Sequence, residues 1–522
     1  MPAPLLWITI LALYALPYGW ARRLAARSAV PYPQIVSLCL TLVFSTGGLS
    51  LMMLALGLLG LPIRLPYILG VYLPLMALGY WPFRRGDPSD RPYLYTTPSL
   101  NPSLEATPFL PTGERVGDRG RNPSAGDSSN RPYWWIVMGG IVAAIALAVM
   151  VNALLWPFYN DDTRGIYAPM AAEIAQTGAL VPITPQRNLY ELYPQLNSMN
   201  YALVDLLAGW QNPYLARGIA AVLSLAVLPA TFLLGAVLSP TADHRMGAIA
   251  PLLAVVVLTL TPDFVRWAST GYVDLPMAFF YALAAVFTWA LIQHGRPVDA
   301  LLGGLCLGLA AWTKNAALLG VLLLGLILVY RLMMKQIHFN NILLYCSVCA
   351  LVILAWYGRN WLLVGQLIPD TIWTEDARQT LREVFILITL PQNYGAAGGL
   401  MLAGAVWAGV KVLFQKDQAA FAFLLWISVP YYLTWLFYAS YDPRFLLLIL
   451  PPLAVMAASW LAPLFAQFQN RRLPMLALCG VVVVLLVSVN VWRGIEYKRV
   501  LWQHGWMSHE QKLVALSLEA VP

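Results

Sequence analysis

The chain has 522 residues, of which 60% are hydrophobic and only 11% are charged, and its net charge is +8. Soluble domains carry about 25% charged residues, so this composition excludes an ordinary soluble protein. Long apolar runs recur from end to end, and each is near the ~20 residues that an α-helix needs to cross a bilayer. Helices that are apolar all round have no polar face to present to water.

The apolar runs predict an all-α polytopic membrane protein with about fourteen transmembrane helices. The segment 299–312 is short, and we expect it to be broken or tilted. The predicted spans are 3–20, 34–60, 62–82, 133–157, 216–239, 246–262, 272–293, 299–312, 315–333, 341–357, 396–414, 418–438, 443–465 and 473–492.

Basic residues predict the orientation, because Lys and Arg prefer cytoplasmic loops. Arg22, Arg23 and Arg27 follow the first span, which places the N-terminus outside. Alternating the spans from there puts 18 of the 32 Lys and Arg residues, and 9 of the 24 acidic residues, on the cytoplasmic side. The net charge is then +9 inside and −1 outside. The basic excess is therefore a topology signal, and we expect no nucleic-acid partner.

The chain divides into three parts. Residues 1–82 form an N-terminal module of three spans with few polar residues. Residues 83–132 are rich in Pro, Ser, Gly and Arg and cannot bury a core, so they are predicted to be a disordered cytoplasmic linker. Residues 133–522 hold the other eleven spans, an outer loop over 159–215 and nearly all the polar residues of interest.

The first outer loop opens with two adjacent carboxylates, Asp161 and Asp162, just beyond a predicted span. Carboxylates at a membrane surface are costly unless they are solvated or used in function. Asp162 also suits the N-cap of a following helix, so capping and function are both open interpretations. Residues 163–176 carry an apolar stripe at helical spacing, which predicts an amphipathic helix in the plane of the interface.

Polar residues also gather at the outer ends of four later turns. Each alone is open to interpretation as a side chain that snorkels to the interface. The positive-inside rule, however, disfavours a cation at all four turns, and an anionic ligand such as a lipid phosphate is a sufficient reason for them. These residues are Asp263, Arg266 and Asp274 in the first turn, Lys314 in the second, Arg359 and Asn360 in the third, and Asp442 and Arg444 in the fourth.

Five stretches of residues 133–522 stand in an order that is similar to a known pattern. They are NDDTRGIYAPMAAEIAQTGAL, ASTGYVDLPMAFFYALA, GLCLGLAAWTKNAALLG, WYGRNWLLVGQLIP and PRFLLLILPPLAVM. This part of the chain resembles the GT-C superfamily of membrane glycosyltransferases, the group that includes dolichyl-phosphate-mannose–protein mannosyltransferases and the aminoarabinose transferase of lipid A. The chain departs from the pattern at three places: Tyr167 stands near a usual His, a usual Pro before Trp356 is missing, and a P-P-L element is reduced to Tyr193-Pro194-Gln195.

The resemblance implies a GT-C-like core that transfers a sugar, with inversion, from a polyprenyl-phosphate donor to an acceptor hydroxyl on the outer face. It implies a general base at Asp161 or Asp162, with Asp162 in the better register. The implied donor-phosphate residues are Lys314, Arg359, Arg266 and Arg444. The implied substrate-binding residues are Arg164, Tyr193, Asp274 and Asn360.

The implied partners are the lipid-linked donor, membrane lipids and an acceptor that is a lipid, a glycan or a protein. A phosphate neutralised by Lys and Arg needs no cofactor, although a divalent metal on the acidic pair stays an open alternative. We expect the protein in a cell membrane, that of a bacterium, with its N-terminus and active site on the outer face.

Two other interpretations remain. A secondary transporter, or a flippase of lipid-linked sugars, places ionisable residues near the bilayer midplane, often in repeated halves. The predicted spans hold almost no charge at mid-depth and show no paired halves, which disfavours transport. An O-antigen-ligase-like enzyme would share the large outer loops, but an acidic pair in the first of them is less expected there.

Overall fold

The computed structural model describes residues 3–80, 134–183, 189–238, 249–368, 382–383, 388, 393–416, 418–438, 442–468 and 505–519. All regular structure within these ranges is helical, which confirms the all-α fold class. The predicted linker 83–132 and the predicted last span 473–492 lie outside the described residues.

Ten of the fourteen predicted spans coincide with described stretches that are long and apolar enough to cross a membrane. The span predicted at 246–262 covers the helix Ile249–Thr259, and the helix Pro262–Ala268 that follows is bent by 69° against it. The spans predicted at 62–82 and 299–312 are helices of 14 and 17 residues. The described residues therefore hold ten or eleven candidate spans of full length. Of the other predicted spans, these two helices fall short of the ~20 residues of a full crossing, and 473–492 lies outside the described residues. The chain is a multi-pass membrane protein.

The helices follow one another with short breaks. They are α1 (Ala3–Ala15), α2 (Tyr18–Arg27), α3 (Pro33–Leu42), η1 (Val43–Gly47), α4 (Gly48–Leu58), α5 (Leu65–Leu78), α6 (Trp134–Leu155), η4 (Thr163–Tyr167), α7 (Ala168–Thr177), η5 (Leu189–Leu192), α8 (Leu196–Ala208), α9 (Pro213–Leu225), α10 (Val227–Leu238), α11 (Ile249–Thr259), α12 (Pro262–Ala268), α13 (Asp274–His294), α14 (Pro297–Thr313), η6 (Asn315–Ala317), α15 (Leu318–Met333), α16 (Phe339–Val364), α18 (Gly395–Phe414), α19 (Ala419–Tyr438), η8 (Pro443–Ile449), α20 (Leu450–Phe468) and α22 (His509–Glu519).

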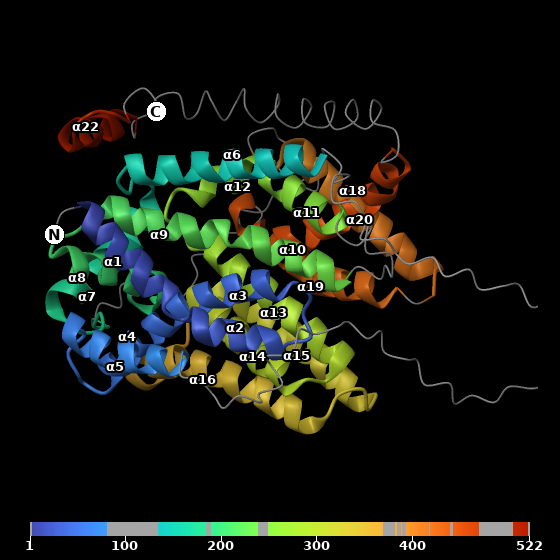
Figure 1. The fold of residues 1–522 in the computed structure, drawn as a ribbon, viewed down its shortest axis with the longest axis horizontal. Helices are drawn as coiled ribbons and strands as arrows, with labels where there is room; N and C mark the ends of the chain where they lie inside the picture. The colour runs from blue at the N-terminus through green and yellow to red at the C-terminus, as the bar shows by residue number, and fades with distance from the viewer. Residues whose placement is uncertain are drawn as a thin grey trace, which may run out of the picture.

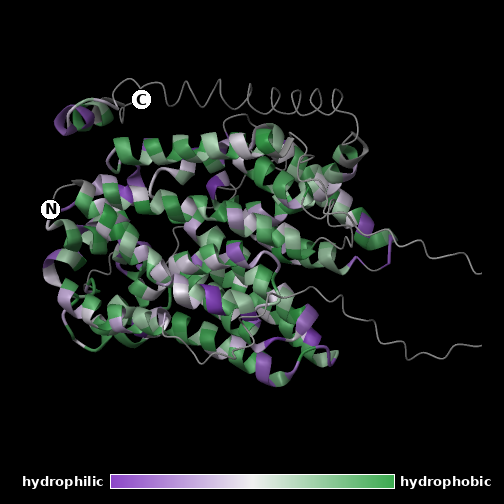
Figure 2. Ribbon diagram, viewed as in Figure 1, coloured by the Kyte–Doolittle hydropathy of each residue, from purple (hydrophilic) through white to green (hydrophobic). Residues whose placement is uncertain are grey.

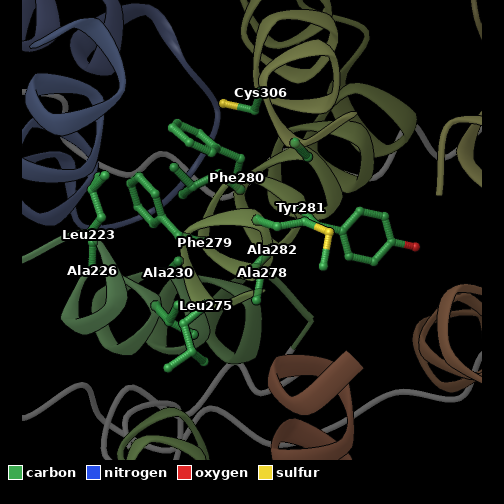
Figure 3. Packing of buried hydrophobic residues seen from close by; sticks show 14 of the residues in the cluster. Leu223, Ala226, Ala230, Leu275, Ala278, Phe279, Phe280, Tyr281, Ala282 and Cys306 are labelled. Carbon is green, nitrogen blue, oxygen red and sulfur yellow. The ribbon is translucent and has the colours of Figure 1, made fainter. Parts of the chain in front are cut away.

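The long helices run roughly along the long axis of the molecule, with α6 along one edge and α16 along the opposite edge (Figure 1). Hydrophobic residues cover most of their length (Figure 2). Helix α13 lies in the centre, and 94% of its most apolar stretch is buried. Figure 3 shows Phe279 of α13 beside Leu223 of α9 and Ala230 of α10, and Phe280 towards Cys306 of α14, whereas the Tyr281 ring points to the other side of α13.

Glycine lets α14 and α16 approach closely. A side chain at Gly304 would collide with the backbone of Tyr345, and one at Gly308 would lie 2.8 Å from Cβ of Val352. These two glycines are four residues apart on α14, a spacing that brings helix backbones into contact in membranes. The close packing holds α13, α14 and α16 together as the frame of the core.

Two turns predicted to be cytoplasmic lie together. Arg296, between α13 and α14, donates to the carbonyl oxygen of Ser28 at 2.9 Å. The Ser28 hydroxyl in turn donates to the Asp299 carboxylate at 2.5 Å. The alternation of predicted spans requires these turns to share one end of the molecule. Which face of the membrane that end occupies stays a prediction.

Candidate active site

The end of α6 is tied to the loop between α12 and α13. Arg217 of α9 is fully buried. Its Nη1 donates to the carbonyl oxygen of Pro157 at 2.9 Å, and its Nε donates to the carbonyl oxygen of Ser269. Its guanidinium lies 4.5 Å from the ring centre of Tyr159. Asn152 of α6 also donates to the Ser269 hydroxyl at 3.0 Å. These bonds fix the backbone just before the acidic pair.

The turn after this point depends on Gly271. Its φ is +89°, a conformation that L-residues with a side chain rarely adopt. A Cβ there would lie 2.6 Å from Phe158 and 3.0 Å from Thr163, so the acidic loop packs directly on this glycine. The Tyr201 hydroxyl closes the contact with a 2.8 Å bond to the Gly271 carbonyl oxygen.

Asp162 precedes a helical stretch formed by η4 and α7, over Thr163–Tyr167 and Ala168–Thr177. The predicted helix is confirmed, and its buried side includes Met170 and Ile174, while its place in the plane of the interface stays a prediction. The Asp162 side chain makes no capping hydrogen bond. It instead accepts a 2.9 Å hydrogen bond from Nη1 of Arg444, so it is not an N-cap here, and its role in catalysis stays a prediction.

Arg444 brings three carboxylates together. Besides Asp162, its Nε lies 3.3 Å from Asp442 and 3.9 Å from Asp274. Asp274 receives a second cation, because Lys314 donates to its other oxygen at 2.6 Å. The side chains of Lys314 and Asp274 are only 9% and 1% exposed, whereas that of Asp162 is 34% exposed. The cluster is thus buried at its base and open at Asp162.

Local structure places each member of the cluster. Asp274 is the first residue of α13, where the helix dipole favours a carboxylate. Lys314 has an extended backbone between α14 and η6, where the helix breaks. Asp442 accepts from the backbone N–H of Arg444 at 2.8 Å and so caps η8 at its start. Helix ends from three parts of the chain therefore meet at one point.

Aromatic rings surround the two cations. The Arg444 guanidinium lies 4.4 Å from the ring centre of Tyr272 and 5.3 Å from those of Trp267 and Phe445. The Lys314 ammonium lies 4.7 Å from the Phe445 ring. Such contacts stabilise a cation more strongly where water is excluded. Burial, with the Asp162 carboxylate as a further cause, raises the pKa of Tyr272 to about 12. Burial also raises the pKa of Tyr167 well above its usual value, with Asp274 and Asp162 as further causes.

A second acid and cation lie on α12. Asp263 is 1% exposed, and its backbone N–H donates to the Asn393 carbonyl oxygen at 2.7 Å. Its carboxylate interacts electrostatically with Arg266, Asp442 and Arg444. The Arg266 guanidinium lies over the Trp267 ring at 4.5 Å. The predicted phosphate ligand Arg266 therefore lies beside the Arg444 cluster.

Arg359 has different neighbours. Its Nη2 donates to the Val181 carbonyl oxygen at 2.8 Å, and its guanidinium lies 4.9 Å from the Trp356 ring. Within the described ranges these contacts join it to the segment after α7 and not to the Arg444 cluster. Its role in phosphate binding stays a prediction.

Of the other predicted residues, some lie near the Arg444 cluster and others do not. Asn360 is fully buried and donates to the Leu192 carbonyl oxygen at 3.2 Å. Tyr193, which follows Leu192 in the chain, interacts electrostatically with Tyr167. Asp161 and Arg164 are exposed. Of the two adjacent acids, only Asp162 has its side chain in the cluster.

No group of three or more metal-ligand side chains occurs among the described residues. Asp162, Asp274 and Asp442 face a guanidinium instead. The sequence analysis did not assign Arg217 or the aromatic residues Trp267 and Tyr272. Arg217 could have been recognised from the sequence, because an arginine within an otherwise apolar span costs free energy unless it has a specific partner.

No protein-family model and no curated protein sequence matches the chain significantly. Among solved structures, it is similar to ArnT from Cupriavidus metallidurans bound to undecaprenyl phosphate, with 18% identity, a TM-score of 0.49, and coverage of 68% of this chain and 66% of that one. The chain is also similar to the archaeal oligosaccharyltransferase AglB from Archaeoglobus fulgidus, in complex with an inhibitory peptide and a dolichol-phosphate. The sequence identity is 10% and the TM-score is 0.47, and the match covers 74% of this chain and 60% of that one. The chain thus spans less than two thirds of the length of these proteins.

Proposed function

We propose that the chain is a glycosyltransferase that moves a sugar from a polyprenyl-phosphate donor to an acceptor hydroxyl. The observation that carries this proposal is the contact of Arg444 with Asp162, beside the buried Asp274–Lys314 pair. It joins a partly exposed carboxylate to two cations at the ends of membrane helices. The five motifs that resemble GT-C enzymes contribute four of these residues.

In the proposed reaction, the acceptor hydroxyl attacks the anomeric carbon from the face opposite the phosphate. A new C–O bond forms as the bond between the anomeric carbon and the phosphate oxygen breaks, so the configuration inverts. Asp162 takes the proton of the hydroxyl, a role that contributes about 10²–10⁴-fold in rate. Its partial exposure leaves it accessible to an acceptor, while Arg444 orients one of its oxygens.

The leaving polyprenyl phosphate gains negative charge in the transition state. Lys314 and Arg444 stabilise that charge, and Arg266 and Arg359 are further candidates for the phosphate. Cations held in place beside aromatic rings stabilise a developing anion without reorganisation at the moment of reaction. Asp274 holds both cations, since its oxygens lie 2.6 Å from Lys314 and 3.9 Å from Arg444.

An apolar cavity beside the cluster suits the lipid part of the donor. Its volume is about 260 Å³, and it lies between α18 and α19 against η8 and α20. Leu446, two residues after Arg444, contributes to its wall, and Tyr394 in the same wall donates to the Pro443 carbonyl oxygen at 2.7 Å. A polyprenyl chain in this cavity would bring its phosphate towards Arg444.

The test is transfer by the purified full-length protein, reconstituted in lipid, from radiolabelled polyprenyl-phosphate sugars to lipid, glycan and peptide acceptors. We expect Asp162→Asn to abolish transfer while the protein still expresses and unfolds at the wild-type temperature. The neighbouring exposed carboxylate gives a matched control, and Asp161→Asn should remain active. Full activity of Asp162→Asn would exclude this carboxylate as the base.

The same preparation separates transfer from transport. A transferase forms a new glycosidic product in detergent, where no second compartment exists. Uptake of a lipid-linked sugar into sealed vesicles without any product would instead support the flippase interpretation. The outer-face location of the site is tested by adding a membrane-impermeant acceptor to intact cells.

A further inference from the structure

We infer that the N-terminal module, residues 3–80, holds the helical stretch that begins at Asp162 in its catalytic position, with Arg64 as the principal positioning residue. This inference rests on the proposed function of Asp162. It gives a role to a part of the chain that lies outside the GT-C resemblance.

Arg64 binds the far end of the helical stretch that follows Asp162. Its Nη1 donates to the carbonyl oxygen of Ala175 and its Nη2 to that of Gln176, both at 3.0 Å. The last carbonyl groups of a helix have no partner within the helix, and a cation also stabilises the negative end of the helix dipole. The backbone N–H of Ile63 adds a 2.7 Å bond to the carbonyl oxygen of Gly178. Three hydrogen bonds from the module therefore close the C-terminal end of α7.

The fit between the module and this helix end is close. Gly178 ends α7 with φ +71°, and a side chain there would lie 2.8 Å from Nε of Arg64. A side chain at Gly57 of α4 would collide with Leu180. From the core, Arg359 of α16 donates to the carbonyl oxygen of Val181. The segment after α7 is thus bonded on two sides, once by the module and once by the core.

The module also holds α8, which packs against α7. The Asn200 side chain is 2% exposed, accepts from the Tyr14 hydroxyl at 2.7 Å and donates to the Ser50 hydroxyl at 2.9 Å. The Ser50 hydroxyl donates in turn to the carbonyl oxygen of Leu196 at 3.0 Å. Buried polar groups that are satisfied in this way specify a single arrangement, because an unpaired one costs more than a bond gains.

These contacts affect the proposed catalytic group because one helical stretch connects Asp162 to the end that Arg64 binds. Asp162 stands at the start of residues 163–177 and Arg64 at their end, a distance of roughly 22 Å at 1.5 Å per residue. Arg444 holds only one oxygen of Asp162, whose side chain is 34% exposed. Fixing the far end limits rotation and sliding of the whole stretch. A misplacement of about 1 Å at a catalytic group is enough to cost up to about 10²-fold in rate.

The test compares Arg64→Ala with a matched control in full-length protein. Arg23 lies in the same module, and its guanidinium donates to the carbonyl oxygen of Leu78 at 3.3 Å, away from α7. We expect Arg64→Ala to lower kcat by about tenfold or more with an unchanged KM for the donor, because the phosphate-binding cations are untouched. Arg23→Ala should leave kcat unchanged. Arg64→Lys should recover part of kcat, since an ammonium still donates to carbonyl oxygens.

Hydrogen exchange gives a readout that does not depend on the reaction. In Arg64→Ala, amides over 162–178 should exchange faster, whereas those of α13 should not. Should the variant unfold, Tyr14→Phe removes only the bond to Asn200 and should produce a smaller change of the same kind. Equal kcat in Arg64→Ala and wild type, or faster exchange throughout the molecule, would overturn the inference. A wild-type protein without transferase activity would refute the proposed function. Hydrogen exchange at 162–178 would still test whether the N-terminal module holds this helical stretch in place.

Discussion

Nη1 of Arg444 lies 2.9 Å from Oδ2 of Asp162, although 282 residues separate them in the chain. The same guanidinium lies within 4 Å of Asp442 and Asp274 and among three aromatic rings. One side chain therefore links the loop after α6 to the start of α13 and to η8. This link connects the proposed base to the proposed phosphate-binding cations.

The first prediction concerns the shape of that cation. Lysine in place of Arg444 keeps the charge but has no planar fork, so it cannot hold Asp162 and Asp442 together. We expect Arg444→Lys to reduce kcat/KM by about 10²-fold, the scale for loss of one preorganised donor. Steady-state transfer kinetics measure the effect. Arg331→Lys, at a half-buried position in the last turn of α15, is the control and should retain wild-type kinetics.

The second prediction separates stability from catalysis at the Lys314–Asp274 pair. Lys314→Gln leaves a carboxylate that is 1% exposed without its closest cation, and we expect a loss of about 3–5 kcal/mol in unfolding free energy. The double variant Asp274→Asn, Lys314→Gln removes both charges and should recover most of that loss. It should remain inactive, because no ammonium is left for the phosphate. Recovery of transfer in the double variant would contradict the phosphate-binding role.

Much of the fold could be predicted because its signal is local. A run of apolar residues specifies a span wherever it occurs, and ten predicted spans coincide with full-length candidate helices. The predicted spans differ from the structure where an apolar run does not form one straight helix of full length. The stretch 246–262 ends at Pro262, where α12 begins and the chain bends by 69° from the direction of α11. The contacts of the N-terminal module are not local, since Tyr14 and Asn200 meet across 186 residues.

The polar residues of the candidate site could be singled out from the sequence because their signal is also local. Each polar turn is visible by itself, because a charge beside an apolar run is unusual. Which turns meet depends on packing, and periodicity carries no information on that. Lys314 and Asp274 proved to be partners, whereas Arg359, with an equally clear motif, bonds to the backbone at Val181. A motif identifies candidates, and the packing decides what each one contacts.

The third prediction tests the close approach at Gly271. Alanine there meets both an unfavourable φ of +89° and Phe158 at 2.6 Å. Gly209 is a matched control, because its φ is +77° but a Cβ would have open space around it. We expect Gly271→Ala to lose about 1–3 kcal/mol more stability than Gly209→Ala, from overpacking. It should also lose transfer activity, since the clash displaces the loop that carries Asp162.

The last prediction tests the apolar cavity with donors of different chain length. Met401 of α18 lies in its wall, and Met401→Trp would fill much of the ~260 Å³ that an isoprenoid chain would occupy. We expect KM to rise at least tenfold for a long polyprenyl-phosphate sugar and to stay unchanged for a donor with one or two isoprene units, which does not reach the filled region. Leu351→Trp provides the control, because Leu351 of α16 is 74% exposed and outside the cavity. An equal rise in KM for both donors would show that the substitution disturbs the phosphate site, since Leu446 joins the cavity wall to Arg444. No change for either donor would place the lipid chain elsewhere on the helices.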